Sequence, residues 1–424
     1  MSLLAERLYS EIVRIPLIDP HTHIDASDPA SRSLADILGY HYYTELAHST
    51  GMDRADMDPS LEPRERVRRL CLRLPALANT VQHSWLLEIS RLLLDLPLQR
   101  IDGTNWEALW EAAQKKMSGP GWPEEVLRRS NIEKVFLTNR FDDPLEGFDT
   151  GRFIPCLRCD DLVFRLHDPD VAGRLRKTTG IQVENLTTLR RALEAVVSRF
   201  RARGAKALAL SLPPEFSPEP ESEGSAGAAL SKALSGRRAN SQDRERLARH
   251  VLWVLADLAQ ETGLPFDLMI GVSRHVYESG VPQGTDLFDR RTSLYQYRAL
   301  FNAFPRVLFP VSVLAHDQNP ELVAYAWIFP NVVAMGHWWY SNIPAFIAQD
   351  ARSRLQAVPA AKQIGYYSDM HKLEFGLPKF NMYRKVLAQV LAEDFVQGRG
   401  FGEEEAIALA RTVLRDNVER IYKV

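Results

Sequence analysis

Pro16-Leu17-Ile18-Asp19-Pro20-His21-Thr22-His23 is a short apolar run that ends in two histidines separated by one residue. Side chains alternate along a strand, so His21 and His23 point the same way from its end and can reach one metal ion together. Imidazole nitrogens bind zinc and neighbouring divalent metals when further ligands complete the site. A His-x-His pair also arises by chance from surface or core histidines, so the rest of the chain decides its meaning.

The composition is that of a globular protein with a large core. The chain has 424 residues, of which 45% are hydrophobic and 25% are charged. This length accommodates either two domains or one barrel with insertions. The net charge of −2 creates no field that would recruit nucleic acid or an anionic membrane. We find no apolar run long enough to cross a bilayer, and the N-terminal residues lack the pattern of a signal peptide.

Cysteine usage fits a reducing compartment, and we expect a cytoplasmic protein. The three cysteines are Cys71, Cys156 and Cys159. Cys156-Leu-Arg-Cys159 is a C-x-x-C pattern that a redox pair or half a zinc site would also show. No second cysteine pair accompanies it, and the segment has the pattern of a strand rather than a helix start. We therefore interpret both residues as ordinary thiols.

Short apolar runs alternate with longer amphipathic stretches along the chain. The pattern predicts eight strands, at residues 17–18, 132–137, 153–157, 205–210, 266–270, 307–314, 332–335 and 364–367. Helix-length stretches such as 186–203 and 242–262 separate them. This alternation predicts an α/β fold, a (β/α)8 (TIM) barrel, whose chemistry gathers at the carboxyl ends of the strands. A doubly wound sheet would also alternate, but its glycine-rich turn after the first strand is missing.

Two stretches interrupt the alternation. Residues from about 32 to 130 contain helical patterns, among them 64–74, which Pro75 ends, and 85–96. We expect a helical insertion there, between the first and second strands. Residues 213–241 are rich in Pro, Glu, Ser, Gly and Ala, which predicts a mobile loop after the fourth strand. Residues 1–424 are then one domain built on the barrel.

Polar side chains follow the predicted strand ends, where a barrel enzyme carries its site. In chain order they are His21, His23, Arg158, Arg274, His275, His316, Asp317, His337, Trp338, Trp339, Asp369 and His371. Ordinary structural alternatives exist, because Asp369 could cap the next helix and the two tryptophans could pack over the barrel mouth. Arg274 could be a surface cation, although an arginine at a barrel mouth also suits capture of a carboxylate.

Motifs spread over nearly the whole chain fit one known family. In chain order they are Asp19-Pro-His21-Thr-His23, Gly39-Tyr40-His41-Tyr42, Thr138-Asn-Arg-Phe-Asp142-Asp143-Pro144, Pro155-Cys-Leu-Arg158-Cys-Asp160, Ile270-Gly271-Val-Ser-Arg274, Gly336-His-Trp338-Trp339-Tyr-Ser-Asn342, Ser368-Asp369 and Asp416-Asn417-Val-Glu-Arg-Ile-Tyr. In this order and at these spacings they resemble the uronate isomerases, a branch of the amidohydrolase superfamily. Tyr40 stands where the family motif G-D-H-Y has an aspartate.

The resemblance implies a distorted barrel of amidohydrolase type and one divalent metal held by His21, His23 and Asp369. Neutral imidazoles and an ionised carboxylate favour zinc, with manganese, cobalt or nickel as alternatives. The implied reaction is the aldose–ketose interconversion of a uronate, such as glucuronate or galacturonate, through an enediol between C1 and C2. In it a cation stabilises the enediolate while a nearby base moves the proton.

The resemblance also assigns roles to rim residues. We expect His41, Tyr42 and Asp369 to be catalytic, with His41 as the first choice for the base because histidine titrates near neutral pH. Arg158 and Arg274 are expected to face the metal and bind the substrate carboxylate together. The remaining expected substrate-binding residues are Trp338, Trp339 and His371.

Three departures from the family fall in the expected mouth. Ala209-Leu210-Ser211 stands where the family has Asp-His-Gly, and Met269 stands where it has a histidine. Asp369-Met370-His371 replaces Asp-Ser-Arg, which removes an arginine that would grip the carboxylate. The metal ligands are kept while substrate contacts are lost, so the identity of the substrate does not follow from the sequence.

Two other functions stay open at this point. One is a metal-dependent hydrolase of a lactone, ester or amide, in which Asp369 takes a proton from the attacking water. The other is a barrel that has lost turnover. We expect a small-molecule sugar acid or related carboxylate as partner, with no nucleic acid and no membrane, and the sequence leaves a homo-oligomer open.

Overall fold

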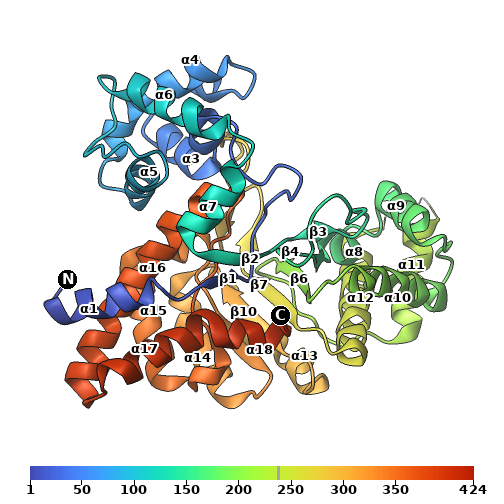
Figure 1. The fold of residues 1–424 in the computed structure, drawn as a ribbon. Coiled ribbons are helices and arrows are strands. Elements are labelled where there is room, and N and C mark those ends of the chain that lie inside the picture. The colour runs from blue at the N-terminus through green and yellow to red at the C-terminus, as the bar shows by residue number, and fades with distance from the viewer. Residues whose placement is uncertain (236–238) are drawn as a thin grey trace.

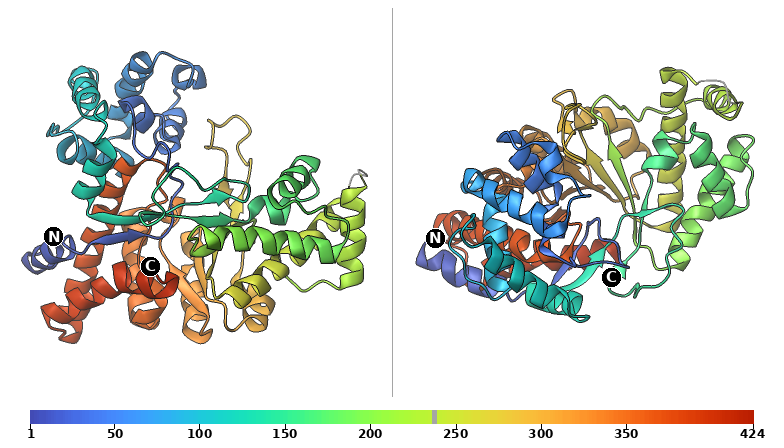
Figure 2. Two further views of the ribbon diagram at one scale, coloured as in Figure 1. Left: turned by 45° about the vertical axis from the view of Figure 1, so that its right-hand side comes forward. Right: turned by 90° about the horizontal axis from the view of Figure 1, so that it is seen from above.

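The computed structural model describes residues 1–235 and 239–424, and parallel strands form its centre (Figures 1 and 2). The barrel strands are β1 (Leu17–Asp19), β2 (Ile132–Phe136), β4 (Phe153–Ile154), β5 (Cys156–Arg158), β6 (Ala207–Leu212), β7 (Phe266–Ile270), β10 (Phe309–Val313), β11 (Val332–Met335) and β12 (Gln363–Ile364). One sheet has the order β1-β2-β4 and a second has the order β12-β11-β10-β7-β6-β5-β3, in which β3 is the short strand Asn139–Arg140. Only Pro155 separates β4 from β5, so these two segments act as one bent strand that joins the sheets.

The strand order follows the chain order around the sheet, as in a (β/α)8 barrel, and this confirms the predicted fold class. No ladder pairs β12 with β1 in the described residues. Backbone hydrogen bonds close the seam instead, from His23 N–H to Met370 O at 2.8 Å and from Asp369 N–H to His21 O at 3.1 Å. The barrel is therefore distorted at the junction of its first and last strands.

The predicted strands are present with some changes in length. The eighth, predicted at 364–367, ends at Ile364 because the N–H of Gly365 bonds to Val413 O instead of to a neighbouring strand. The sixth is shorter than predicted, at Phe309–Val313. Short strands that the sequence pattern did not reveal are β3 (Asn139–Arg140) and the antiparallel hairpin of β8 (Val272–Ser273) with β9 (Leu287–Phe288).

Helices follow the strands as predicted. Those around the barrel are α1 (Leu3–Ile12), α8 (Asp160–Phe164), α9 (Pro169–Thr179), α10 (Leu186–Ala202), α12 (Ser241–Thr262), α13 (Arg298–Ala303), α14 (Asn319–Ile328), α15 (Pro344–Ala357), α16 (Gly376–Val390), α17 (Glu403–Arg411) and α18 (Asn417–Tyr422). Gly263 ends α12 in the left-handed conformation, with φ 69°, which glycine adopts without a steric penalty. None of the helices in the described residues combines the length and the apolar character needed to cross a bilayer.

The segment between β1 and β2 is helical, as expected, and stands above the barrel in Figure 1. Its helices are α2 (Leu34–Leu38), α3 (His41–Ser49), α4 (Pro63–Arg73), α5 (Val81–Leu92), α6 (Trp106–Met117) and α7 (Trp122–Ser130). The predicted helix at 85–96 begins earlier, at Val81, because the side chain of Thr80 caps it by accepting a hydrogen bond from the N–H of His83.

Residues 213–241, predicted as a mobile loop, contain the helix α11 (Glu223–Leu234). Ser222 caps this helix, and Ala226, Ala229 and Leu230 are buried at helical spacing. The stretch before it is fixed to α12, since Trp253 Nε1 donates to Pro218 O at 2.9 Å. This helix was not predicted because most of its residues are small, which leaves only a weak apolar periodicity in the sequence. Residues 236–238 of the predicted loop lie outside the described residues.

The barrel interior is filled from strand side chains and from the C-terminus. Ile18, Phe136, Met269 and Met335 meet there, and Tyr422 of α18 joins the same cluster. The Tyr422 hydroxyl donates to Oδ1 of Asp267, a fully buried carboxyl group on β7, at 2.9 Å. Burial raises the pKa of Asp267 well above its ordinary value, which favours the neutral acid, and the Tyr422 hydroxyl is its hydrogen-bond partner.

Tyr422→Phe should lower the free energy of unfolding by about 1–3 kcal/mol, because it removes the partner of a buried polar group. Urea unfolding at neutral pH measures the change. Asp267→Asn is the matched control, since an amide oxygen still accepts the tyrosine proton, and it should cost less. Equal stability of Tyr422→Phe and wild type would contradict this account of the barrel floor.

Candidate metal centre

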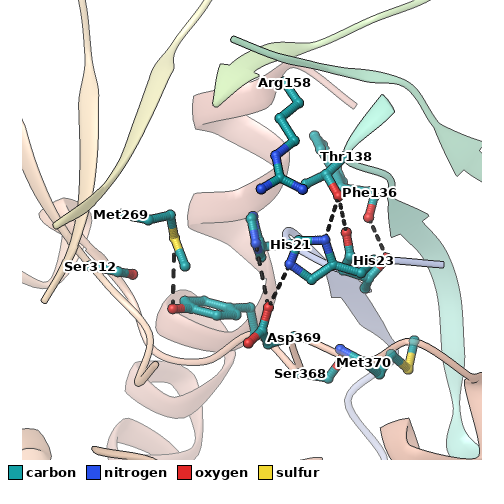
Figure 3. A network of polar contacts seen from close by, with 12 residues as sticks. His21, His23, Phe136, Thr138, Arg158, Met269, Ser312, Ser368, Asp369 and Met370 are labelled. Atoms are coloured by element: carbon teal, nitrogen blue, oxygen red, sulfur yellow. Dashed lines mark hydrogen bonds and ion pairs between the residues drawn. The ribbon is translucent and has the colours of Figure 1, made fainter. Parts of the chain in front are cut away.

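Two imidazoles and one carboxylate meet at the mouth of the barrel, at its seam (Figure 3). Each of His21, His23 and Asp369 offers an atom that lies within 4.8 Å of the others. Oδ1 of Asp369 is 3.2 Å from Nε2 of His23 and 3.6 Å from Nε2 of His21. The two histidines therefore point to one place, as predicted, although β1 ends at Asp19, and the third expected ligand lies beside them.

Asp19 positions the segment that carries Asp369. Its Oδ2 accepts from Oγ of Ser368 at 2.5 Å and its Oδ1 accepts from the N–H of Ser368 at 3.1 Å. Nζ of Lys379, on α16, donates to the carbonyl of Ser368 at 2.8 Å. Held from both sides, Asp369 adopts φ 53°, a left-handed conformation that residues other than glycine rarely take.

The tautomer of His23 follows from its neighbour Thr138. Oγ1 of Thr138 lies 3.0 Å from the carbonyl oxygen of Thr22 and 2.8 Å from Nδ1 of His23. The carbonyl can only accept, so the hydroxyl proton goes to it and Nδ1 of His23 carries the proton that Thr138 accepts. A neutral His23 then presents the lone pair of Nε2 to Asp369, which is the orientation of a metal ligand.

The donor set fits a cation. Asp369 Oδ1 is buried and accepts no hydrogen bond of normal geometry in the described chain, while its nearest neighbours are imidazole nitrogens. Burial lowers the pKa of His21 to about 3, so this ring is neutral near pH 7. Burial by itself would raise the pKa of Asp369, but nearby positive charge, including that of Lys379, holds it below its ordinary value. Neutral imidazoles with an ionised carboxylate are the forms that bind zinc and related metals.

The rings of His371, His41 and Trp339 form an aromatic wall beside the cluster. The ring of His371 lies 4.9 Å from that of His23 and 6.0 Å from that of His41, and Trp339 lies 5.2 Å from His41. His41, at the start of α3, is 8% exposed, and its Nδ1 lies 2.6 Å from Oε1 of Glu45. The insertion therefore brings an imidazole paired with a carboxylate to the barrel mouth.

A buried lysine lies behind this wall. Nζ of Lys379 is 4.8 Å from the ring centre of Tyr42, 5.1 Å from that of Trp85 and 5.5 Å from that of Tyr40. Aromatic faces attract a cation, which makes the buried charge tolerable. The hydroxyl of Tyr42 is buried and has no hydrogen-bond partner among the described residues.

The structure brings most of the predicted site residues together. Those that lie at or beside the cluster are His21, His23, His41, Tyr42, Arg158, Trp338, Trp339, Asp369 and His371. Arg274 does not line the cavity at the cluster: it pairs with Asp286 at 2.6 Å in the hairpin after β7, and its side chain is 44% exposed. His316 and His337 lie instead against the buried carboxylate of Asp350, at 2.9 and 3.4 Å.

The positions at which the chain departs from the family motifs line the same cavity. Ala209, Leu210, Ser211 and Met269 lie there with the histidines and Arg158. The free space at the cluster is about 20 Å³. At these four positions the cavity lining is therefore mostly apolar in this chain, and the hydroxyl group of Ser211 is the one polar side-chain group among them. Cys156 and Cys159 are buried free thiols, as predicted.

Sequence reasoning missed the residues that hold the ligands. Asp19, Thr138 and Ser368 stood in the quoted motifs without an assigned role, and Lys379 and Glu45 were not singled out. A signal existed for Glu45, because a carboxylate four residues after His41 on a helix lies on the same face. Nothing local marks Lys379, since a lysine in an amphipathic helix is ordinarily exposed.

Known proteins match the chain over its whole length. A "Uronate isomerase" from Rhizorhabdus wittichii is 24% identical over 455 residues, covering 100% of this chain and 96% of that protein. The crystal structure of a uronate isomerase from Thermotoga maritima superposes with a TM-score of 0.91 at 22% identity, covering 100% of this chain and 98% of the other. A glucuronate isomerase from Caulobacter crescentus gives a TM-score of 0.90 at 19% identity, covering 99% and 94%.

These structures confirm the barrel fold that the strand order indicates. The family assignment comes from the whole-chain sequence match. The model of the family UxaC, glucuronate isomerase, matches residues 1–420. The chain belongs to the glucuronate isomerase family.

Proposed function

We propose that the protein is a metal-dependent isomerase that interconverts the aldose and ketose forms of a hexuronate such as glucuronate or galacturonate. The observation that carries the proposal is the His21, His23 and Asp369 cluster with an acid–base group, His41 paired with Glu45, beside it. The relatives that match the whole chain are named uronate isomerases, which supports the same reaction. We propose zinc as the metal, with manganese, cobalt or nickel as alternatives.

A divalent metal bound by the three ligands would polarise the substrate carbonyl and lower the free energy of the enediolate. His41 is then suited to move the proton between C1 and C2. Glu45 accepts the Nδ1 proton of His41, so Nε2 is the atom that takes and returns a proton. Burial raises the pKa of Tyr42 well above its ordinary value, so its hydroxyl stays protonated and can donate to a substrate oxygen.

The neighbouring rim residues limit the access of water to the proposed site. Trp338 lines the cavity and Trp339 packs edge-on against His41, which keeps water from the enediolate. His371 stands where the family motif has an arginine, and burial lowers its pKa to about 3, so it offers a neutral ring. We propose a cytoplasmic location, because free thiols are consistent with a reducing compartment.

Metal content tests the ligand set. Protein purified without chelator should contain about one equivalent of divalent metal, and His21→Ala/His23→Ala should contain almost none, because one carboxylate alone binds weakly. Elemental analysis measures it. His48→Ala is the matched control, since His48 lies on α3 and bonds to Met52 O and the Tyr277 hydroxyl instead. Equal metal in the double variant and wild type would remove the proposed site.

Thr138→Val should weaken metal binding roughly 10- to 100-fold, because it removes the acceptor that fixes the His23 tautomer. Thr138→Ser keeps the hydroxyl and should bind nearly as wild type does. Competition with a fluorescent chelator gives both affinities. Identical binding by the valine and serine variants would mean that Thr138 does not orient the ligand.

Turnover of glucuronate in heavy water tests the reaction. An isomerase that passes through an enediol should place deuterium on carbon in the product, which NMR detects. His41→Asn should slow the reaction on the order of a hundredfold, because the base is lost, while His48→Asn, on the same helix, should change the rate far less. A product made by water cleaving a bond, with no isotope on carbon, would rule out the isomerase and favour a hydrolase in which Asp369 takes the water proton.

A further inference from the structure

Two arginines lie side by side at the mouth of the barrel. β3 and β5 pair in parallel, and Arg140 is the ladder partner of Arg158. Residues that face each other on neighbouring strands place their side chains on the same face, and like charges there destabilise a sheet. An anion that binds both guanidinium groups would remove this repulsion.

The nearby carboxylates neutralise this pair only weakly. Within residues 1–235 and 239–424, Arg140 makes one side-chain hydrogen bond, 3.3 Å to Oδ2 of Asp142, and Arg158 makes one, 3.2 Å to Oδ1 of Asp160. A guanidinium group has five N–H donors, so most donors of both side chains are available. Asp142 also accepts a hydrogen bond from Arg174, at 3.1 Å, so it is shared between two arginines.

Both arginines line one cleft of about 400 Å³. Two further arginines line it, but each is held by several carboxylates. Arg165 pairs with Asp161 and Asp168, the latter at 2.8 Å. Arg174 pairs with Asp161 at 2.7 Å and with Asp170 at 3.0 Å. Arg140, in contrast, has only its contact with Asp142, at 3.3 Å, in the described residues.

The cleft adjoins the metal centre. Arg158 and Asp160 line both the cleft and the cavity that contains His21 and His23. The cavity at the cluster, about 20 Å³, has room for about one water molecule. A six-carbon substrate that reaches the cluster therefore extends past Arg158, and the cleft is the adjoining free space.

We propose that Arg140 and Arg158 together bind the anionic end of the substrate, the carboxylate of an open-chain sugar acid remote from its reacting carbonyl. The inference rests on the proposed function and adds Arg140 as a specificity-determining residue. Paired guanidinium forks match the geometry of a carboxylate. They also compensate for the arginine that His371 replaces and for Arg274, which Asp286 holds in the hairpin.

Equilibrium binding of an unreactive ligand tests the anion site separately from turnover. Galactarate has the sugar-acid chain without an aldehyde or ketone group, and galactitol is its uncharged counterpart. Calorimetry with the protein as purified should show that Arg140→Gln weakens galactarate binding about tenfold or more, through loss of charge-assisted hydrogen bonds, with no change for galactitol. In turnover of glucuronate, the same variant should raise KM and largely keep kcat.

Arg165→Gln is the matched control, because it makes the same charge change in the same cleft at a side chain that carboxylates already hold. It should change galactarate binding less than twofold. Wild-type affinity in Arg140→Gln, or an equal loss in Arg165→Gln, would overturn the proposal. Arg140-dependent galactarate binding by a protein that isomerises no uronate would contradict the proposed reaction and leave the anion site standing.

Discussion

The site depends on one buried contact across the seam of the barrel, between Asp19 and Ser368. β1 and β12 form no ladder in the described chain, so this carboxylate and two backbone hydrogen bonds join the first and last strands. His21 and His23 lie on one side of the seam and Asp369 on the other. The closure of the barrel thus sets the spacing of the proposed ligands. Burial raises the pKa of Asp19 to about 7 despite its hydrogen bonds, which shows how costly this position is for a charge.

The strands on each side of this seam could be predicted from the sequence, whereas the contacts across it could not. Strand periodicity and the alternation of side chains are local, so the barrel strands and the shared direction of His21 and His23 were predictable. The motif resemblance added Asp369 as the third ligand. The contact between Asp19 and Ser368 spans 349 residues, and no local pattern encodes its register. The eighth strand was predicted to be longer than it is for a related reason. The N–H of Gly365 bonds to a carbonyl group distant in the sequence rather than to a neighbouring strand.

Lys379 shows how the fold carries charge next to this seam. It is fully buried, and burial lowers its pKa to about 8, yet it makes no ion pair with a carboxylate within the described residues. The faces of Tyr40, Tyr42 and Trp85 and the carbonyl of Ser368 replace water around it. Tyr40 occupies the position of an aspartate in the family motif, so an aromatic face now stands where a carboxylate would. The hydroxyl of Tyr40 donates to Asp369 O at 3.1 Å, which adds a further hold on the same segment.

A kept motif residue need not keep its direction, and Arg274 illustrates why. Asp286 accepts from its guanidinium and from the N–H of His275, which ties the start of the hairpin to its end. The hairpin in turn reaches α3 of the insertion, where Tyr277 contacts His48 at 3.1 Å. Arg274 therefore stabilises the strap between barrel and insertion, the two parts that supply the metal ligands and His41. Arg274 lines neither the cavity at the ligand cluster nor the cleft beside it, whereas Arg158 lines both and Arg140 lines the cleft, so the proposed anion contacts fall to these two arginines. Arg140 and Arg158 lie on β3 and β5, and the cleft that they line adjoins the cavity at the ligand cluster.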